Sequence, residues 1–145
     1  MPSISRSKPL ILFWRFHRWI YQASDGRIGS SFAGNKVLKV TTTGRKSGEP
    51  RSILIYYFTH QDSYVIIGSN AGSDRHPAWY LNLQANPAAE IQVGRQRMNV
   101  IARTAVGEER ERLWSEVVNK DPSYIEYQEM TDREIPVVVL DPTQT

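Results

Sequence analysis

The stretch KVLKVTTTGRKSGEPRSILIYYF, residues 36–58, places a short polar turn between two runs of strand-forming residues. Valine, isoleucine, threonine and tyrosine dominate the two runs, and β-branched and aromatic side chains favour strands. Two glycines and a proline lie between the runs, where these residues mark a turn. The sequence therefore predicts a β-hairpin with strands at 36–43 and 52–59, which points to a sheet-based fold.

The predicted turn is unusually basic for a hairpin. It carries Arg45, Lys46 and Arg51, and the first 51 residues hold ten lysines and arginines against two acids. Such a charge balance favours an anionic partner. Cations, a hydroxyl such as that of Ser47, and glycines that let backbone N–H groups approach a ligand are typical of a phosphate cradle. A solvated turn whose charge has no role fits the same residues, so the turn alone leaves both interpretations open.

The remaining pattern predicts one mainly β domain of the α+β class. Further strands are expected at 64–68, 90–93, 98–105 and 135–140, and helices at 78–84, at 107–119 and through Tyr124 and Tyr127. Strands and helices do not alternate and no G-x-G-x-x-G motif is present, which excludes a Rossmann fold. Six mostly antiparallel strands with short hairpins predict a small closed or partly closed barrel. We expect this domain to span residues 35–145.

Residues 1–34 are predicted to form an amphipathic helix and a connector. The helical part, PLILFWRFHRWIY at 9–21, is apolar and aromatic but contains basic side chains, and it is too short to span a bilayer. It either packs on the domain or lies at a membrane interface. No signal-peptide cleavage site follows it. A cytoplasmic protein is therefore expected, with peripheral membrane contact through this helix left open.

The sequence shows no catalytic nucleophile of its own. The absence of cysteine excludes thiolate catalysis, zinc fingers and iron–sulfur ligation. The three histidines lack ligand spacing, so no metal site is expected. GRKSG is not a Walker loop, and no nucleic-acid motif or long basic stripe is present, so no nucleic-acid partner is expected. If the protein is an enzyme, we expect a cofactor to carry the chemistry.

Two further stretches have the composition of a binding site. SNAGSDRHPAWYLNL, residues 69–83, is a small-residue loop that leads to a helix N-terminus, which favours an anion or the polar edge of a ring. Trp79 would either wall a planar ligand or belong to the core. SYIEYQEMTDREIPVV, residues 123–138, places two tyrosines on one helical face, where phenols can donate protons or pack as ordinary core aromatics.

Together these three stretches resemble the deazaflavin (F420)-dependent nitroreductase family. The resemblance rests on TTTGRKSGEPR, SNAGSDRHPAWYLNLQANP and YQEMTDREIPVVVL and runs from about residue 35 to 140. It implies a split β-barrel similar to that of FMN-binding proteins, and coenzyme F420 as the cofactor. It also implies hydride transfer from the reduced deazaflavin to a small-molecule acceptor, such as a quinone, a nitro compound or an activated alkene.

The resemblance also implies which positions form the site. The phosphate and the start of the cofactor tail would be held by Arg45, Lys46, Ser47, Gly48 and Arg51. The deazaflavin ring would be lined by Ile55, Tyr56 and Tyr57, and the ring and ribityl chain would be bordered by Ser69, Asn70, Ala71 and Gly72. Trp79 would pack beside the tail or ring. The residues that orient the acceptor or supply a proton would be Tyr124 and Tyr127.

Two departures from the family pattern bear on the acceptor. Asn70 stands where family members often carry lysine, and Met130 stands where an aromatic residue is common. Three other questions stay open at this point. The same fold could use FMN, the protein could be a non-catalytic F420 carrier, and it could be a monomer or a homodimer.

Overall fold

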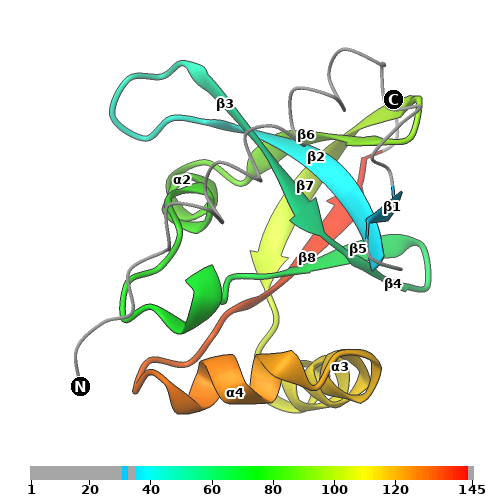
Figure 1. The fold of residues 1–145 in the computed structure, drawn as a ribbon. Helices are drawn as coiled ribbons and strands as arrows, with labels where there is room; N and C mark the ends of the chain where they lie inside the picture. Colours follow the sequence, from blue (N-terminus) through cyan, green and yellow to red (C-terminus); the bar gives the residue numbers. More distant parts are fainter. Residues whose placement is uncertain (1–30, 33–34, 144–145) are drawn as a thin grey trace.

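A computed structural model describes residues 31–32 and 35–143 of the chain (Figure 1). The amphipathic helix predicted at 9–21 lies outside the described residues. The strands are β1 (Ser31–Phe32), β2 (Asn35–Thr43), β3 (Pro50–Tyr56), β4 (Phe58–His60), β5 (Ser63–Ile67), β6 (Ala88–Val93), β7 (Gln96–Thr104) and β8 (Val137–Pro142). The helical segments are the short 3-10 helix η1 (Asn70–Gly72) and the α-helices α2 (Ala78–Ala85), α3 (Gly107–Lys120) and α4 (Ser123–Glu129).

The strands form one curled antiparallel sheet. Its order is β1-β2-β6-β7-β8-β5-β4. β3 lies off this path and pairs with β2 on the edge opposite β6. The predicted hairpin is confirmed, because β2 and β3 pair from Thr43 opposite Pro50 to Val37 opposite Tyr56. The curled sheet is a half-barrel, and this confirms the predicted split-barrel architecture.

The described residues contain eight strands rather than the six predicted. One addition is the short β1. The other arises because the run predicted at 52–59 breaks at Tyr57, whose N–H donates to the carbonyl of Lys36 at 3.0 Å. Before the break the chain pairs with β2, and after it β4 pairs with β5. The chain therefore turns from one part of the sheet to another at this corner of the barrel.

The sheet buries hydrophobic side chains on both of its faces. Along β8, Val138 and Leu140 pack in one cluster, which also contains Trp79 and Leu83 of α2. The alternate side chains of β8 pack in a second cluster with Leu113 of α3. Because successive side chains of a strand point to opposite faces, one strand serves both clusters. Figure 1 shows α2 separated from α3 and α4, which run together along the lower side of the sheet.

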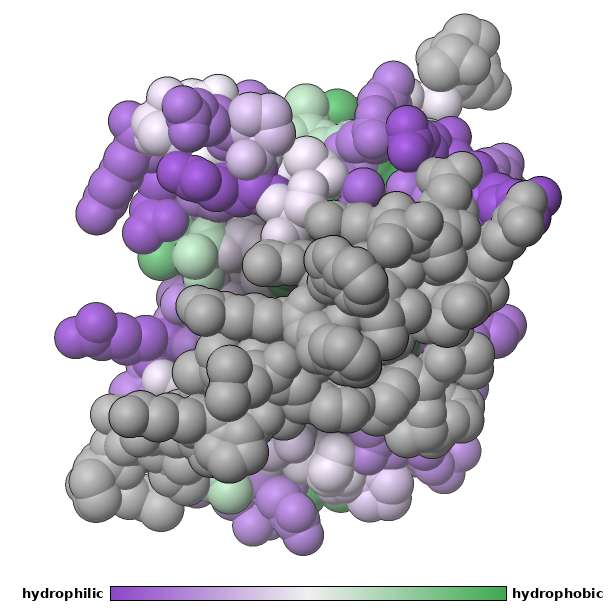
Figure 2. Space-filling model, turned by 45° about the horizontal axis from the view of Figure 1, so that its top comes forward, coloured by the Kyte–Doolittle hydropathy of each residue, from purple (hydrophilic) through white to green (hydrophobic). Residues whose placement is uncertain are grey.

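On the face drawn in Figure 2, hydrophilic side chains dominate the described residues, and hydrophobic ones appear only in small patches. None of the helices in the described part of the chain has the length and apolar character needed to cross a bilayer.

Candidate functional site: a basic turn, a left-handed loop and a tyrosine cluster

The β2–β3 turn is closed by its own backbone. The N–H of Gly44 donates to the carbonyl of Glu49, and the N–H of Gly48 donates to the carbonyl of Gly44, both at 2.8 Å. Gly48 has a φ of 73°, a left-handed conformation that favours glycine. The turn projects from the rest of the fold (Figure 1). It exposes all five residues predicted to hold the phosphate, namely Arg45, Lys46, Ser47, Gly48 and Arg51.

A buried asparagine of α2 fixes this turn to the domain. Both the backbone N–H and the guanidinium Nη1 of Arg45 donate to Asn82 Oδ1, each at 3.1 Å. Asn82 Nδ2 in turn donates to Thr42 Oγ1 at 3.1 Å, and Asn82 is only 4% exposed. The sequence analysis did not identify Asn82. The signal that could have found it is an amide among the apolar residues of a short helix, where a buried polar side chain requires partners.

The turn retains donors that suit an anion. Within the described part of the chain, the backbone N–H groups of Lys46 and Ser47 donate no hydrogen bond. Arg51 faces Glu49 at 3.8 Å, and both side chains are largely exposed. An exposed pair of this kind contributes little, so Arg51 can exchange it for a ligand. This donor set fits a phosphate or carboxylate group.

The second predicted stretch forms a loop at residues 69–72, referred to below as the left-handed loop because three of its residues have a left-handed backbone conformation. Asn70, Ala71 and Gly72 have positive φ values of 48°, 55° and 80° in succession. A Cβ added to Gly72 would lie 2.6 Å from Met130 Sδ and 3.2 Å from the carbonyl oxygen of Tyr127. Only glycine therefore allows this loop to approach the end of α4 so closely, which brings two of the predicted stretches together.

Arg133 binds this loop from the connector between α4 and β8. Its guanidinium donates to the carbonyls of Ser73, Gly68 and Ser69 at 2.9, 3.1 and 2.8 Å. Its Nη1 also lies 3.2 Å from His76 Nδ1. Burial lowers the pKa of His76, and the adjacent Arg133 lowers it further. The sequence analysis gave Arg133 no role, because a single arginine in an acidic segment carries no local signal.

The predicted tyrosine pair belongs to a larger cluster. The ring of Tyr124 lies edge-on to Tyr127 and Phe58, with centroids 5.9 and 6.1 Å apart. Tyr124 is only 6% exposed, and burial raises its pKa, with smaller effects from Asp121, Tyr127 and Tyr56. Burial also raises the pKa of Tyr56, again with effects from Asp121 and Tyr127. Of the predicted pair, Tyr127 is the less buried.

The residues predicted to line the ring, Ile55, Tyr56 and Tyr57, are divided between the two faces of the sheet. Ile55 and Tyr57 pack against the hydrophobic cluster on the α2 side of the sheet, whereas Tyr56 packs with Val37 and Leu54 on the other face. Successive residues of a strand cannot line one ring from the same side. Of the three, Tyr56 is the one whose pKa is raised partly by Tyr127, and it in turn contributes to the raised pKa of Tyr124.

Trp79 has a structural place in the fold. It is 8% exposed and packs in the hydrophobic cluster on the α2 side of the sheet. Of the two interpretations of Trp79, this position agrees with the one that assigned it to the core. Its ring lies edge-on to that of Tyr80, with the centroids 6.1 Å apart. Its most direct effect on the site is therefore to anchor α2, the helix that carries Asn82.

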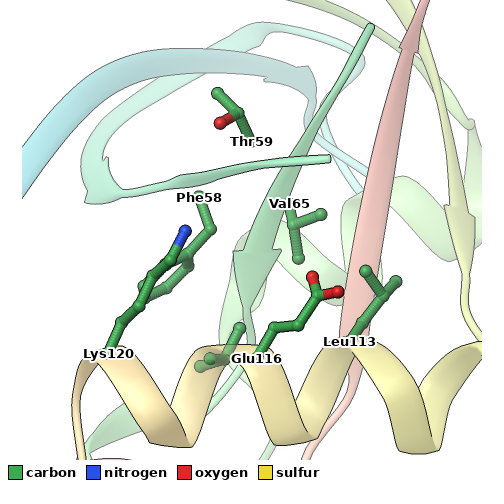
Figure 3. Close-up of a pocket in the computed structure, with 7 residues that line it drawn as sticks. Phe58, Thr59, Val65, Leu113, Glu116 and Lys120 are labelled. Carbon is green, nitrogen blue, oxygen red and sulfur yellow. The ribbon is translucent and has the colours of Figure 1, made fainter. Parts of the chain in front are cut away.

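A small hollow lies between the β4–β5 hairpin and α3 and shares Phe58 with the tyrosine cluster (Figure 3). It comprises about 220 Å³, including open solvent, and is lined by Phe58, Thr59, Val65, Leu113, Glu116, Val117 and Lys120. None of these residues was predicted for the site. Among the described residues, no group of three or more histidine or acidic side chains could hold a metal ion.

The family to which this chain belongs follows from its match to a family sequence model. The sequence model of the family described as F420H(2)-dependent quinone reductase matches residues 13–142. The chain belongs to this family. Membership confirms the predicted resemblance to F420-dependent oxidoreductases, the enzyme class and coenzyme F420 as the family's cofactor.

Individual relatives agree with this assignment. The F420H(2)-dependent quinone reductase Rv1261c of Mycobacterium tuberculosis is 41% identical over 131 residues, which cover 87% of each chain. A solved F420-H2 dependent reductase, FDR-A, is 39% identical, with a TM-score of 0.67, over 72% of this chain and 93% of the other. A solved structure described as a domain-swapped dimer is 33% identical, with a TM-score of 0.69, and the match covers 93% of this chain and 100% of that chain.

The family description is narrower than the predicted set of hydride acceptors. The sequence analysis allowed quinones, nitro compounds and activated alkenes as acceptors, and the family description names quinones. The matched residues include the basic turn, the left-handed loop and the tyrosine cluster. The roles of individual residues in these three features remain predictions.

Proposed function

We propose that this protein binds reduced coenzyme F420 and uses it to reduce a quinone. The observation that carries this proposal is the turn that Asn82 clamps through Arg45, in a member of the F420H(2)-dependent quinone reductase family. The turn offers cations and backbone N–H groups that suit the phosphate and tail carboxylates of the cofactor. An FMN phosphate would suit the same donors, so family membership is what favours F420.

Each of the three features of the site would contact a different part of the cofactor. The anionic part of the cofactor would lie at Arg45, Lys46, Ser47, Gly48 and Arg51. The left-handed loop, Ser69, Asn70, Ala71 and Gly72, would border the ring and ribityl chain. Tyr56 would contact the ring from the tyrosine cluster, while Ile55, Tyr57 and Trp79 would support it from the core.

The bound deazaflavin supplies the hydride, and the protein supplies orientation and a proton. Tyr127 is the predicted proton donor because it is the less buried of the two predicted phenols. Tyr124 lies behind it and is predicted to hold its ring in place. The Tyr56 phenol is protonated at neutral pH, as an ordinary tyrosine is, and burial raises its pKa further, so it can donate a hydrogen bond to an acceptor oxygen. Hydride and proton together convert the quinone to a hydroquinone.

The test begins with binding and continues with turnover. Purified protein would be titrated with oxidised F420 and, in parallel, with FMN, followed by fluorescence polarisation. We expect tight F420 binding and weak FMN binding, and then oxidation of F420H2 when a soluble quinone is added. A preference for FMN would overturn the cofactor assignment. F420 binding with no turnover of any quinone would favour the carrier function instead.

Two expectations about partners stay open to direct measurement. Because one relative was solved as a domain-swapped dimer, we propose a homodimer as the state to test against a monomer by analytical ultracentrifugation. Peripheral membrane contact through the helix predicted at 9–21 stays a prediction, which sedimentation with phospholipid vesicles would check.

A further inference from the structure

Arg133 lies outside the residues proposed to touch the cofactor, yet its guanidinium donates hydrogen bonds to backbone carbonyls on both sides of η1. Three guanidinium nitrogens bind three backbone carbonyls. The carbonyls of Gly68 and Ser69 precede η1, and that of Ser73 follows it. A planar guanidinium with donors in a fixed fork therefore joins the two ends of this loop.

The loop requires such a restraint. Asn70 and Ala71 both have positive φ, a region that residues with a Cβ avoid. Conformations of this kind persist where the surrounding structure determines them, and they concentrate at ligand sites. Asn70 Nδ2 adds a bond to the carbonyl of Arg75 at 3.0 Å, which holds the far side of the loop.

Arg133 is itself held in place by α4. Gln128 Nε2 donates to the carbonyl of Arg133 at 2.8 Å, and Gln128 Oε1 accepts from the N–H of Ile135 at 2.9 Å. The N–H of Arg133 donates to Thr131 Oγ1 at 3.3 Å. The connector that carries Arg133 is therefore fixed to the helix that carries Tyr127.

We propose that Arg133 is a positioning residue that holds the loop at 69–72 in the conformation that binds F420. Through Gln128 it also sets the spacing between this loop and the tyrosines of α4. This inference rests on the proposed function, because it assigns the loop to the cofactor. It predicts that loss of the fork releases the loop without removing any group that touches the cofactor.

The test compares two conservative variants of arginines whose guanidinium groups each donate from three nitrogens. Arg133→Lys keeps the positive charge but cannot bridge three carbonyls. Arg103→Lys is the matched control, because the Arg103 guanidinium also donates from three nitrogens, to the carboxylates of Asp141 and Glu109, and none of these partners belongs to the loop or to the connector that carries Arg133. Amide hydrogen exchange of residues 68–76 would be measured in the cofactor-free proteins. Affinity for oxidised F420 and the KM and kcat for a soluble quinone would then be measured.

We expect Arg133→Lys to raise exchange in residues 68–76 and to weaken F420 affinity by about tenfold, the scale of one charge-assisted hydrogen bond. With F420H2 saturating, kcat should fall less than the affinity. Arg103→Lys should change neither the loop exchange nor the affinity. Arg133→Met should match or exceed the effect of the lysine variant.

Several outcomes would overturn the proposal. Unchanged loop exchange in Arg133→Lys would show that the fork does not hold the loop. Raised exchange with unchanged F420 affinity would separate the loop from the cofactor. If the unmodified protein does not bind F420, the proposed function fails, and the positioning role toward the cofactor falls with it, while the exchange comparison still decides whether Arg133 restrains the loop.

A second variant keeps the proposal testable if Arg133→Lys does not fold. Gln128→Ala leaves the guanidinium intact but removes the two bonds that fix its connector to α4. It should raise exchange of residues 68–76 and weaken F420 binding in the same direction, to a smaller extent. Unchanged exchange in this variant would contradict the link between α4 and the loop.

Discussion

Arg45 illustrates how a ligand-binding side chain is oriented before the ligand arrives. Its backbone N–H and its guanidinium both donate to Asn82 Oδ1. An arginine that is already restrained loses less conformational entropy on binding than a free one. The guanidinium keeps further N–H groups beyond the one that binds Asn82, and these are available to an anion.

Replacing this side chain should weaken cofactor binding specifically. Arg45→Ala removes a charge-assisted contact of about 1.5–3 kcal/mol, so the affinity for oxidised F420 should fall roughly 10- to 100-fold. Arg112→Ala, an exposed cation on α3, is the matched control and should leave the affinity unchanged. Fluorescence titration checks both variants. An unchanged affinity in Arg45→Ala would remove Arg45 from the phosphate site.

Tyr127 should affect turnover more than binding. A proton donor in the transition state typically contributes a factor of about 10² or more, so Tyr127→Phe should lower kcat by about 100-fold or more. Its F420 affinity should stay within about twofold of the unmodified protein, because the aromatic ring is retained. Tyr64→Phe is the control, since Tyr64 packs with Tyr57 on the other face of the sheet. Equal losses of kcat and affinity in Tyr127→Phe would argue against the proton-donor role.

His76 should make stability depend on pH. Its pKa is lowered in the folded protein from an ordinary value of 6.5, so the unfolded chain binds this proton more readily. Above that value both states are neutral at His76, and as the pH falls below it the unfolded state is protonated first. Folding stability therefore falls until the lowered folded pKa is passed.

Urea unfolding near pH 7.5 and near pH 5.5 would measure this loss, since a histidine titrates across this range. His76→Gln has no such proton and should lose less stability on acidification than the unmodified protein. The carboxyl groups common to both proteins cancel in the comparison. If the two proteins lose the same stability, His76 does not contribute.

At the scale of an element, α2 acts as the support of the basic turn. Asn82 joins the helix to both Thr42 and Arg45, across 40 and 37 residues of sequence. Asn82→Ala leaves those groups without their partner in a buried place, which costs about 1–3 kcal/mol. Urea unfolding should show this loss, and F420 affinity should fall with it. Gln84→Ala on the exposed side of the same helix should lose less stability and keep its affinity.

The elements also show which parts of the fold the sequence could predict. The hairpin and α2 were predicted because strand-forming runs, turn glycines and a helix after Pro77 are local signals. The break at Tyr57 was not predicted, because it depends on which strands the chain pairs with before and after it.

The candidate site also contains parts that the sequence could predict and parts that it could not. The basic turn and the tyrosine pair were found from short motifs. Asn82 and Arg133 were missed because their partners are far away in sequence: the carbonyls that Arg133 binds lie 60 to 65 residues before it. For residues 55–57, alternation along the strand places Tyr56 on a different face of the sheet from Ile55 and Tyr57, so the prediction that all three line the ring stays to be tested.

At the scale of the whole molecule, the two hydrophobic clusters share strands β5 and β8. Ile66 and Val65 are adjacent in β5 but pack in different clusters. Neither cluster can lose its packing without disturbing a strand that the other needs. The described domain should therefore unfold as one cooperative unit, as small single domains usually do.

Each cluster has its own tryptophan to report on it. Trp79 lies in the α2-side cluster and Trp114 packs against the α3-side cluster. With 5-fluorotryptophan, the ¹⁹F signals of these two residues, assigned from single Trp→Phe variants, should disappear at the same urea concentration. Leu113→Ala, which removes a buried side chain from the α3-side cluster, should cost about 2–5 kcal/mol and move both transitions together. If only the Trp114 signal moved, the two faces of the sheet would unfold separately, and the link between α4 and the cofactor loop would have to act locally rather than through a shared core.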